Sequence, residues 1–260
     1  MNEAHTPAID ALALGGRIVP GDLPCLLCQA RSSAVCSVLG EERIACLNDF
    51  VVRRRIDAGG RLFDEGDPAA HYFVVTEGAM MAFKEAHDGR RQITGFLYAG
   101  DMLGLNHHQR YVYSAEALND AVVCQYEIAD LRELFRAYPE VEHWLLRHCS
   151  DELASAHDQM FLLGRKNAME KIATFLWFQV HRTRLRSRNL TLLDLPMTRR
   201  DIADYLGLTV ETVSRTITRM RLAGTIGTIG KHGIDILDIE DLRQRAGGGR
   251  ALRPATARRV

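Results

Sequence analysis

Hydrophobic and polar residues alternate in short runs across residues 53–127. The runs HYFVVTEG, RQITGFLYAG and DAVVCQYE are rich in β-branched and aromatic residues, which is typical of short strands. Glycines separate these runs at intervals of 12, 11 and 11 residues, at Gly66, Gly78, Gly89 and Gly100. Since glycine allows turns that a bulkier residue resists, the regular spacing predicts an antiparallel β-barrel or β-roll.

After Pro139 the pattern becomes helical, with apolar residues at intervals of three or four over about 23 residues. The members of this stripe are Val141, Leu145, Cys149, Leu153, Ala156, Met160 and Leu163. A helix of that length spans about 35 Å at roughly 1.5 Å per residue, which is longer than one small barrel requires. We therefore expect the helix to pair with its counterpart in a homodimer, although a core helix in a monomer is the alternative. Beyond Gly164, RKNAMEKIATFLWFQVHRT predicts a second helix.

Residues 197–221, MTRRDIADYLGLTVETVSRTITRMR, predict two helices joined by a glycine turn. Thr198 followed by Asp201 is typical of a capping box at a helix start, and Gly207 permits the turn between the helices. The apolar face of the first helix consists of Ile202, Ala203 and Leu206. This arrangement is a helix-turn-helix.

The second helix of this pair begins after Thr209. Its apolar residues Val213, Ile217 and Met220 take one face, which leaves Glu211, Ser214 and Arg215 together on another. A recognition helix presents its amino-terminal residues to the bases of the major groove. Arginine can bond guanine, glutamate can accept from cytosine, and serine can contact a base or a phosphate. The candidate DNA-binding residues are therefore Glu211, Ser214, Arg215, Thr209, Thr212 and Arg199; the alternative is an ordinary solvated helix surface.

The next segment, GTIGTIGKHGIDILD, predicts a β-hairpin wing with Lys231 and His232 at its tip. Charge supports a polyanionic partner: residues 165–260 carry 19 Lys+Arg against 9 Asp+Glu, although the whole chain has no net charge. A solvated basic surface would give the same excess.

Length and hydropathy fix the broad class. The 260 residues, 47% apolar, suffice for two domains with cores of their own. Residues 1–20 do not resemble a signal peptide, and no run reaches the roughly 20 apolar residues that cross a bilayer. We expect a cytoplasmic protein without a membrane segment. The expected divisions are an amino-terminal segment 1–40, a sensor 41–138, a dimer helix 139–164, a DNA-binding domain 165–245 and a flexible basic tail 246–260.

The segment LPCLLCQARSSAVCSVL places Cys25, Cys28 and Cys36 close together. A two-residue gap lets two sulfurs converge on one ion or one cluster face. Three thiols leave one coordination position open. In a chain without an export signal, such cysteines are expected to be reduced, metal-bound or buried rather than disulfide-bonded.

The chain resembles the CRP/FNR superfamily of bacterial transcription regulators, and in particular the FNR branch. The resemblance lies in QITGFLYAGDMLG, KNAMEKIATFL and MTRRDIADYLGLTVETVSR, with an E-x-x-S-R signature on Glu211, Ser214 and Arg215. It implies an α+β chain: an amino-terminal antiparallel β-roll sensor (a cupin-like jelly roll), a long dimerisation helix and a carboxyl-terminal winged helix-turn-helix. It also implies a non-enzymatic homodimer that binds double-stranded DNA at a TTGAT-N4-ATCAA palindrome. The loop HDGRR, residues 87–91, is then a candidate contact for RNA polymerase, with a plain turn as the alternative.

Relatives in this superfamily use cyclic AMP, haem or an iron–sulfur cluster as effector. Cyclic-nucleotide members resemble one another in a glutamate and an Arg-Ser or Arg-Thr pair, but here Leu105 and Tyr113 occupy the glutamate and arginine positions. The FNR branch implies a [4Fe-4S] cluster held by three amino-terminal cysteines and one from the roll. On this resemblance the ligands are Cys25, Cys28, Cys36 and Cys124, with the seven-residue gap of FnrN-type relatives and Cys46 as a substitute ligand. Loss of the cluster to oxygen would weaken the dimer and its operator binding.

Other assignments stay open. Four thiolates also suit structural zinc, and a reversible disulfide switch would use the same residues. His107 and His108 could ligate haem but fit a solvated loop better, and Cys46 and Cys149 otherwise read as small core or seam residues. An iron–sulfur electron carrier or redox enzyme is disfavoured because no nucleophile–base pair, phosphate-binding loop or second cysteine group accompanies the first.

Overall fold

The computed structural model describes residues 17–18, 28, 30, 34–39, 51–105, 109–184, 192–230 and 233–247. The chain forms two compact units. The first combines Met1–Lys84 with Phe96–Ala137, and the second combines Glu85–Gly95 with Tyr138–Val260. The short insert Glu85–Gly95 therefore belongs to the second unit, although strands of the first unit flank it in sequence.

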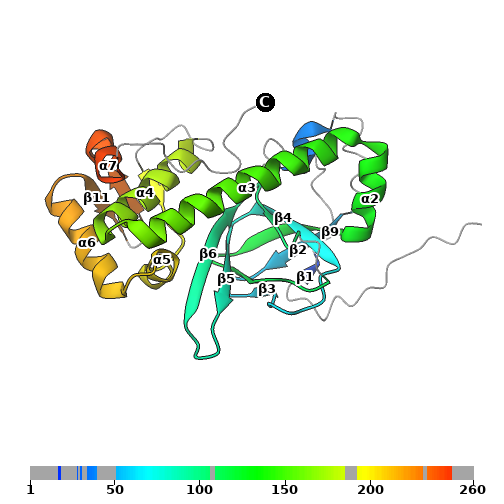
Figure 1. Cartoon of the computed structure of the whole chain (residues 1–260), viewed down its shortest axis with the longest axis horizontal. Coiled ribbons are helices and arrows are strands. Elements are labelled where there is room, and N and C mark those ends of the chain that lie inside the picture. Colours follow the sequence, from blue (N-terminus) through cyan, green and yellow to red (C-terminus); the bar gives the residue numbers. More distant parts are fainter. Residues whose placement is uncertain are drawn as a thin grey trace, which may run out of the picture. The chain divides into compact units, whose positions relative to one another are not determined.

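The first unit is built on two antiparallel sheets (Figure 1). The five-stranded sheet has the order β1 (Arg17–Ile18), β2 (Val52–Ile56), β9 (Ala121–Glu127), β4 (His71–Glu77) and β7 (Met102–Leu103). The four-stranded sheet has the order β3 (Arg61–Phe63), β8 (Ser114–Ala117), β5 (Ala79–Glu85) and β6 (Arg91–Tyr98). The unit ends with helix α2, Ile128–Ala137. The predicted antiparallel β-roll is confirmed.

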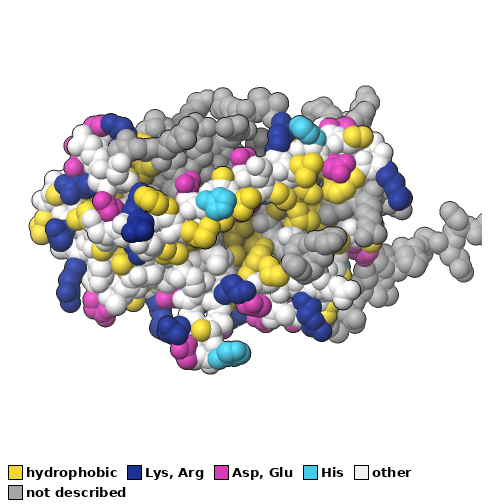
Figure 2. Space-filling view, viewed as in Figure 1, with side chains coloured by type: hydrophobic (Ala, Val, Ile, Leu, Met, Phe, Trp, Pro, Cys, Tyr) yellow, Lys and Arg dark blue, Asp and Glu magenta, His cyan; other side chains and the backbone are white. Residues whose placement is uncertain are grey.

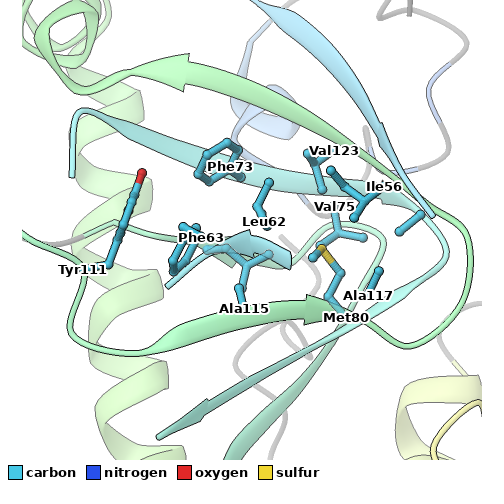
Figure 3. Close-up of a cluster of buried hydrophobic side chains, with 12 residues drawn as sticks. Ile56, Leu62, Phe63, Phe73, Val75, Met80, Tyr111, Ala115, Ala117 and Val123 are labelled. Carbon is cyan, nitrogen blue, oxygen red and sulfur yellow. The ribbon is translucent and has the colours of Figure 1, made fainter. Parts of the chain in front are cut away.

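The two faces of β9 serve different clusters. Val123 joins the core of the roll, in which Phe63 and Tyr111 stack with ring centroids 3.8 Å apart (Figure 3). Because successive side chains of a strand point to opposite faces, Cys124 points away from that core. Cys124 and Tyr126 join a second buried cluster.

The glycines that separate the predicted strands all lie at turns. Gly66, Gly78, Gly89 and Gly100 have φ values of 94°, 75°, 80° and 96°, in the left-handed region that favours glycine. Space is also restricted at Gly78, where a Cβ atom would lie 2.4 Å from the carbonyl oxygen of Asp120. The chain reversal at Gly78 therefore depends on glycine twice over.

The second unit begins with α3, a single helix of 27 residues from Pro139 to Arg165. The predicted long helix is confirmed, but most of its apolar stripe is not buried within the described residues. In that stripe Leu153, Ala156 and Met160 are exposed. Leu153 and Met160 are about three-fifths exposed, as are Leu146 and Phe161 on the same helix. Cys149 is exposed as well, so the expectation of a core residue there is wrong, while a position in a seam between two copies stays a prediction.

A winged helix-turn-helix completes the second unit (Figure 1). Its elements are α4 (Ala168–Arg184), β10 (Leu192–Asp194), α5 (Arg199–Leu206), α6 (Val210–Leu222), β11 (Ile226–Ile229), β12 (Gly233–Ile236) and α7 (Ile239–Arg245). The order β10-β12-β11 pairs the two wing strands as predicted. Lys231 and His232, the predicted wing tip, lie outside the described residues. Nowhere in the described ranges does a helix have the length and hydropathy needed to cross a bilayer.

Candidate DNA-reading helix and candidate cysteine site

Helix α5 starts at a complete capping box. The hydroxyl of Thr198 accepts a hydrogen bond from the backbone N–H of Asp201 at 3.2 Å, and the Asp201 carboxylate accepts from the backbone N–H of Thr198 at 2.8 Å. These bonds satisfy donors that a helix start otherwise leaves unpaired. Ile202, Ala203 and Leu206 are buried, so the predicted cap and apolar face are both confirmed.

The turn to α6 uses the predicted glycine. Gly207 has φ 59° and ψ 47°, in the left-handed region. Thr209 then caps α6, because its hydroxyl accepts from the backbone N–H of Thr212 at 3.2 Å, and the two hydroxyl oxygens lie 3.0 Å apart. The hydroxyl groups of Thr209 and Thr212 thus have a capping role, and DNA contact by either residue stays a prediction.

The three candidate reading residues share the exposed face of α6. Glu211, Ser214 and Arg215 are exposed, while the apolar residues Val213, Ile217 and Met220 are buried. Hydrogen bonds from its own backbone N–H and from the Thr209 hydroxyl, together with the Arg215 cation, lower the pKa of the Glu211 carboxyl. An ionised carboxylate is the acceptor that a cytosine amino group requires.

Two further residues lie at the starts of these helices. Arg199, the first residue of α5, is half-buried, and desolvation lowers the pKa of its guanidinium. Val210, the first residue of α6, is apolar and 39% exposed, and it was not among the predicted DNA-binding residues. An exposed apolar side chain beside Glu211 could contact a thymine methyl group. The exposure of Val210 is the signal that identifies this residue, and the helical pattern alone does not reveal it.

In the first unit, Cys124 lies on β9 with 7% of its surface exposed. Its cluster includes Tyr72, Val74 and Tyr126 from the sheet, and Ala30 and Ala34 from the amino-terminal segment. Cys28 is half-buried and packs against the same cluster. The structure therefore brings one of the three amino-terminal cysteines and the roll cysteine to one cluster.

Cys36 reaches the edge of this cluster from a short 3-10 helix, η3, Val35–Val38. Its Sγ atom lies 4.0 Å from the hydroxyl oxygen of Tyr126. Tyr126 stacks on Tyr72 with ring centroids 4.8 Å apart. Burial raises the pKa of the Tyr72 phenol, and the charges of Cys36 and Asp130 raise it further. The sequence carried no signal for this pair of tyrosines.

The donor set suits a thiolate-bound centre but is not complete within the described residues. Cys28, Cys36 and Cys124 form no disulfide. In the part of the chain that the structure describes, no three Cys, His, Asp or Glu side chains gather closely enough to hold a metal ion. Four predicted or alternative ligands lie outside that part: Cys25, Cys46, His107 and His108. Cys28 and Cys124 belong to one buried group of side chains and Cys36 lies at its edge, while binding of a metal centre by these thiols together with Cys25 stays a prediction.

The positions that bind a cyclic nucleotide in other members have different partners here. Leu105 packs against the cluster around Cys124. The Tyr113 hydroxyl accepts from the backbone N–H of Gly104 at 2.8 Å, and the Ser114 hydroxyl accepts from the backbone N–H of Glu65 at 2.9 Å. These side chains offer no cation to a buried phosphate.

Comparison with known families covers both units. Residues 170–245 match a Crp-like helix-turn-helix domain, and residues 53–138 match a cyclic nucleotide-binding domain. The structure is similar to that of FixK2 from Bradyrhizobium japonicum, with a TM-score of 0.72, 34% identity, and coverage of 77% of this chain and 99% of that one. A CooA mutant from Carboxydothermus hydrogenoformans shares the fold at a TM-score of 0.69 and 20% identity, over 82% of this chain and 96% of that one.

Similar curated proteins are transcription regulators. The nitrogen fixation regulation protein FixK of Bradyrhizobium diazoefficiens is 39% identical over 85% of this chain and 93% of its own length. The transcriptional activator protein FnrL of Cereibacter sphaeroides is 35% identical over 86% of this chain and 92% of its own. The transcriptional activator protein anr of Pseudomonas aeruginosa is 38% identical over 80% and 86%. This chain belongs to the FNR branch of the CRP/FNR family of DNA-binding transcription regulators.

Proposed function

We propose that the protein is an oxygen-responsive regulator of anaerobic or microaerobic genes, which binds a [4Fe-4S] cluster and, as a dimer, a TTGAT-N4-ATCAA palindrome. The observation that carries the proposal is that Cys28 and Cys124 pack in one buried group of hydrophobic side chains. The Sγ atom of Cys36 lies 4.0 Å from the hydroxyl oxygen of Tyr126, a member of the same group. Cys25, Cys28, Cys36 and Cys124 would hold the [4Fe-4S] cluster. When bound, it would supply the sensitivity to oxygen, and its binding depends on all four thiolates.

The residues around the thiols give the segment a defined place on the roll. Ala30 and Ala34 are each 1% exposed and pack with Tyr72 and Tyr126. The backbone N–H of Ala34 donates to the carbonyl of Ala30 at 2.9 Å, which forms a turn immediately before η3. Thiolates on both sides of this turn and on β9 would tie the segment to the sheet. Release of the thiolates would remove these ties and leave the contacts of Ala30 and Ala34 in place.

Helix α3 offers a surface for a second copy of the chain. Leu146, Leu153 and Met160 are 64%, 59% and 61% exposed and follow one another every seven residues. Hydrophobic side chains show at the surface along α3 in Figure 2. A heptad spacing is the pattern of a two-stranded coiled coil. A dimer formed there would present two α6 helices to half-sites about 34 Å apart.

Each α6 would read one half-site through its exposed face. Arg215 would donate to guanine, the ionised Glu211 would accept from cytosine, and Ser214 would contact a base or a phosphate. Arg199 at the start of α5 would neutralise a backbone phosphate. Contact with RNA polymerase is part of the same proposal.

The test is anaerobic purification with an absorption spectrum, iron, zinc and acid-labile sulfide counts, and operator binding measured before and after exposure to air. We expect about four iron and four sulfide per subunit, and loss of palindrome binding as the visible absorbance bleaches. Zinc in the counts without acid-labile sulfide would show that the thiols form a structural metal site and not an iron–sulfur cluster. Unchanged binding and oligomeric state after bleaching would refute the oxygen switch.

A further inference from the structure

The segment Glu85–Gly95 joins β5 to β6 and includes the first residues of β6; it is called the β5–β6 turn here. It is attached to the first helix of the DNA-reading motif within the second unit. Arg91 donates from Nη2 to Asp201 Oδ1 at 2.6 Å and to Asp204 Oδ2 at 3.1 Å, and from Nε to Asp204 Oδ2 at 3.2 Å. The three side chains are only 21%, 11% and 24% exposed. Charge-assisted bonds of this kind are stronger than neutral ones, and the guanidinium plane fixes their directions.

The carboxyl-terminal end of α5 is held as well. Helix ends leave backbone carbonyls without intrahelical donors, and side chains from three other elements supply donors here. Gln92 of the turn and Gln159 of α3 donate to the carbonyl of Tyr205 at 3.2 and 3.0 Å. Lys171 of α4 donates to the carbonyl of Leu206 at 3.0 Å. The turn thus contacts α5 at both ends, through Arg91 and Gln92.

Asp201 has two tasks in this arrangement. Its Oδ2 atom accepts from Thr198 in the capping box, and its Oδ1 atom accepts from Arg91. The same carboxylate therefore sets where α5 begins and where the turn is attached. Since α6 follows α5 after the three-residue turn Gly207–Thr209, the orientation of α5 determines where Glu211 and Arg215 lie.

We propose that Arg91 is a positioning residue for operator recognition: its ion pairs with Asp201 and Asp204 hold α5 in the orientation that places α6 on the bases. The inference rests on the proposed binding of the TTGAT-N4-ATCAA operator, which the wild type tests by itself, and it does not depend on whether the cysteines hold a metal. The two arginines of the HDGRR loop then have different roles. Arg90, with a side chain 84% exposed, pairs with Asp88 inside the turn, so Arg90 is free of this task and serves as the matched control.

The test compares the full-length variants Arg91→Ala, Asp204→Ala, the double variant and Arg90→Ala. Affinities for a TTGAT-N4-ATCAA duplex and for a scrambled duplex are measured anaerobically at one salt concentration, with protein concentrations corrected for the active fraction. We expect Arg91→Ala and Asp204→Ala each to weaken operator binding by about 5- to 20-fold, and the double variant to be no weaker than the poorer single variant, because contacting residues are not additive. Arg90→Ala should bind like the wild type.

The specific-to-scrambled ratio separates positioning from loss of charge or of folded protein. Positioning predicts that the ratio falls, whereas an equal loss on both duplexes would overturn the proposal. Unchanged or tighter operator binding by Arg91→Ala, or strictly additive losses, would also overturn it. Arg91→Lys keeps the charge but not the fork, so it should bind the operator more tightly than Arg91→Ala and more weakly than the wild type. If Arg91→Ala is too unstable to assay, Arg91→Lys is compared with the wild type and with Arg90→Ala, and a specific-to-scrambled ratio equal to theirs would overturn the proposal. Iron counts for each variant show whether the cysteine site has changed.

Discussion

The DNA-reading motif and the candidate cysteine site differ in how far apart in sequence their defining contacts are. In the reading motif, Thr198 caps with Asp201, and Thr209 caps with Thr212, three residues away in each case. In the cysteine site, Cys36 and Tyr126 are 90 residues apart. The first site is formed by local rules of helix formation, and the second requires the roll to be folded.

This contrast has a consequence for function. A site built from neighbouring residues can fold without an effector, whereas thiols on a short amino-terminal turn need something to hold them to a distant strand. The reading motif should therefore be a constant part of the protein, and the cysteine site the part that responds.

The largest effect is expected from Cys124→Ser, which removes the single proposed ligand on the sheet. Anaerobic protein should lose its iron and sulfide, and operator affinity should fall by at least about 100-fold, because a monomer contacts one half-site and specific binding exceeds non-specific binding by about 10³-fold or more. Metal counts, gel filtration and operator titration provide the measurements.

Cys149→Ser is the matched control, because Cys149 is exposed on α3 and lies outside the cluster around Cys124. It should retain iron and operator binding. Equal iron in both variants would show that Cys124 is not a ligand, and the contrast between the two regions would then lose its basis.

The second prediction concerns the stability of the reading motif. Leu206 is fully buried at the end of α5, and Leu222 is 79% exposed at the end of α6. Leu206→Ala should lower the free energy of unfolding of the second unit by about 2–5 kcal/mol. Leu222→Ala should change it by less than about 0.5 kcal/mol.

Denaturant unfolding followed by circular dichroism measures both effects. A loss for Leu222→Ala as large as that for Leu206→Ala would mean that another surface covers Leu222. Iron content should not differ between these variants, since neither residue belongs to the first unit.

These differences explain what the sequence could predict. The glycine spacing predicted the strands of the roll because each of the four glycines has a positive φ. The helix-turn-helix was predictable because the capping box, Gly207 and the buried Ile202 and Leu206 obey rules that operate within one or two turns.

Contacts between distant segments could not be predicted in the same way. Nothing near Arg91 in the sequence indicates Asp201, which lies 110 residues away, and nothing indicates that Tyr72 and Tyr126 stack beside Cys36. The pattern of α3 was also ambiguous, because an apolar stripe looks the same whether it packs in its own chain or against a second copy. Cys149, interpreted as a core or seam residue, is exposed in the single chain, so the core interpretation is wrong and the seam stays a prediction.

The third prediction concerns base reading. Arg215→Ala should weaken operator binding by about 1–3 kcal/mol, the value of one good bidentate base contact, and relax discrimination at one base pair of each half-site. Competition with single-substitution operators identifies that base pair.

Arg243→Ala is the comparison, because this substitution removes the same charge from α7. There the Arg243 guanidinium forms an ion pair with Glu240 at 2.6 Å. It should leave discrimination unchanged. A uniform loss across all sequences for Arg215→Ala would make Arg215 a phosphate contact instead.

The smallest effect is expected from the pH dependence of the ion pair on α7. Hydrogen bonds from Arg245 and from the Thr225 hydroxyl lower the pKa of the Asp241 carboxyl below its ordinary value of 3.8. A carboxyl with a lowered pKa in the folded state stabilises that state at any pH above its unfolded value, and the stabilisation disappears as the pH falls from about 3.8 through the lower folded pKa. Because the group is partly exposed, we expect the free energies of unfolding of wild type and Asp241→Asn to differ by only about 1 kcal/mol at neutral pH.

Unfolding of the second unit, measured between pH 7 and pH 2, should show the stabilities of the two proteins converging below the ordinary pKa of an aspartate. Arg245→Ala should remove most of the difference, since the hydrogen bond from Arg245 is the largest cause of the lowered pKa. Parallel curves for wild type and Asp241→Asn would show that this carboxylate does not couple folding of the second unit to protons.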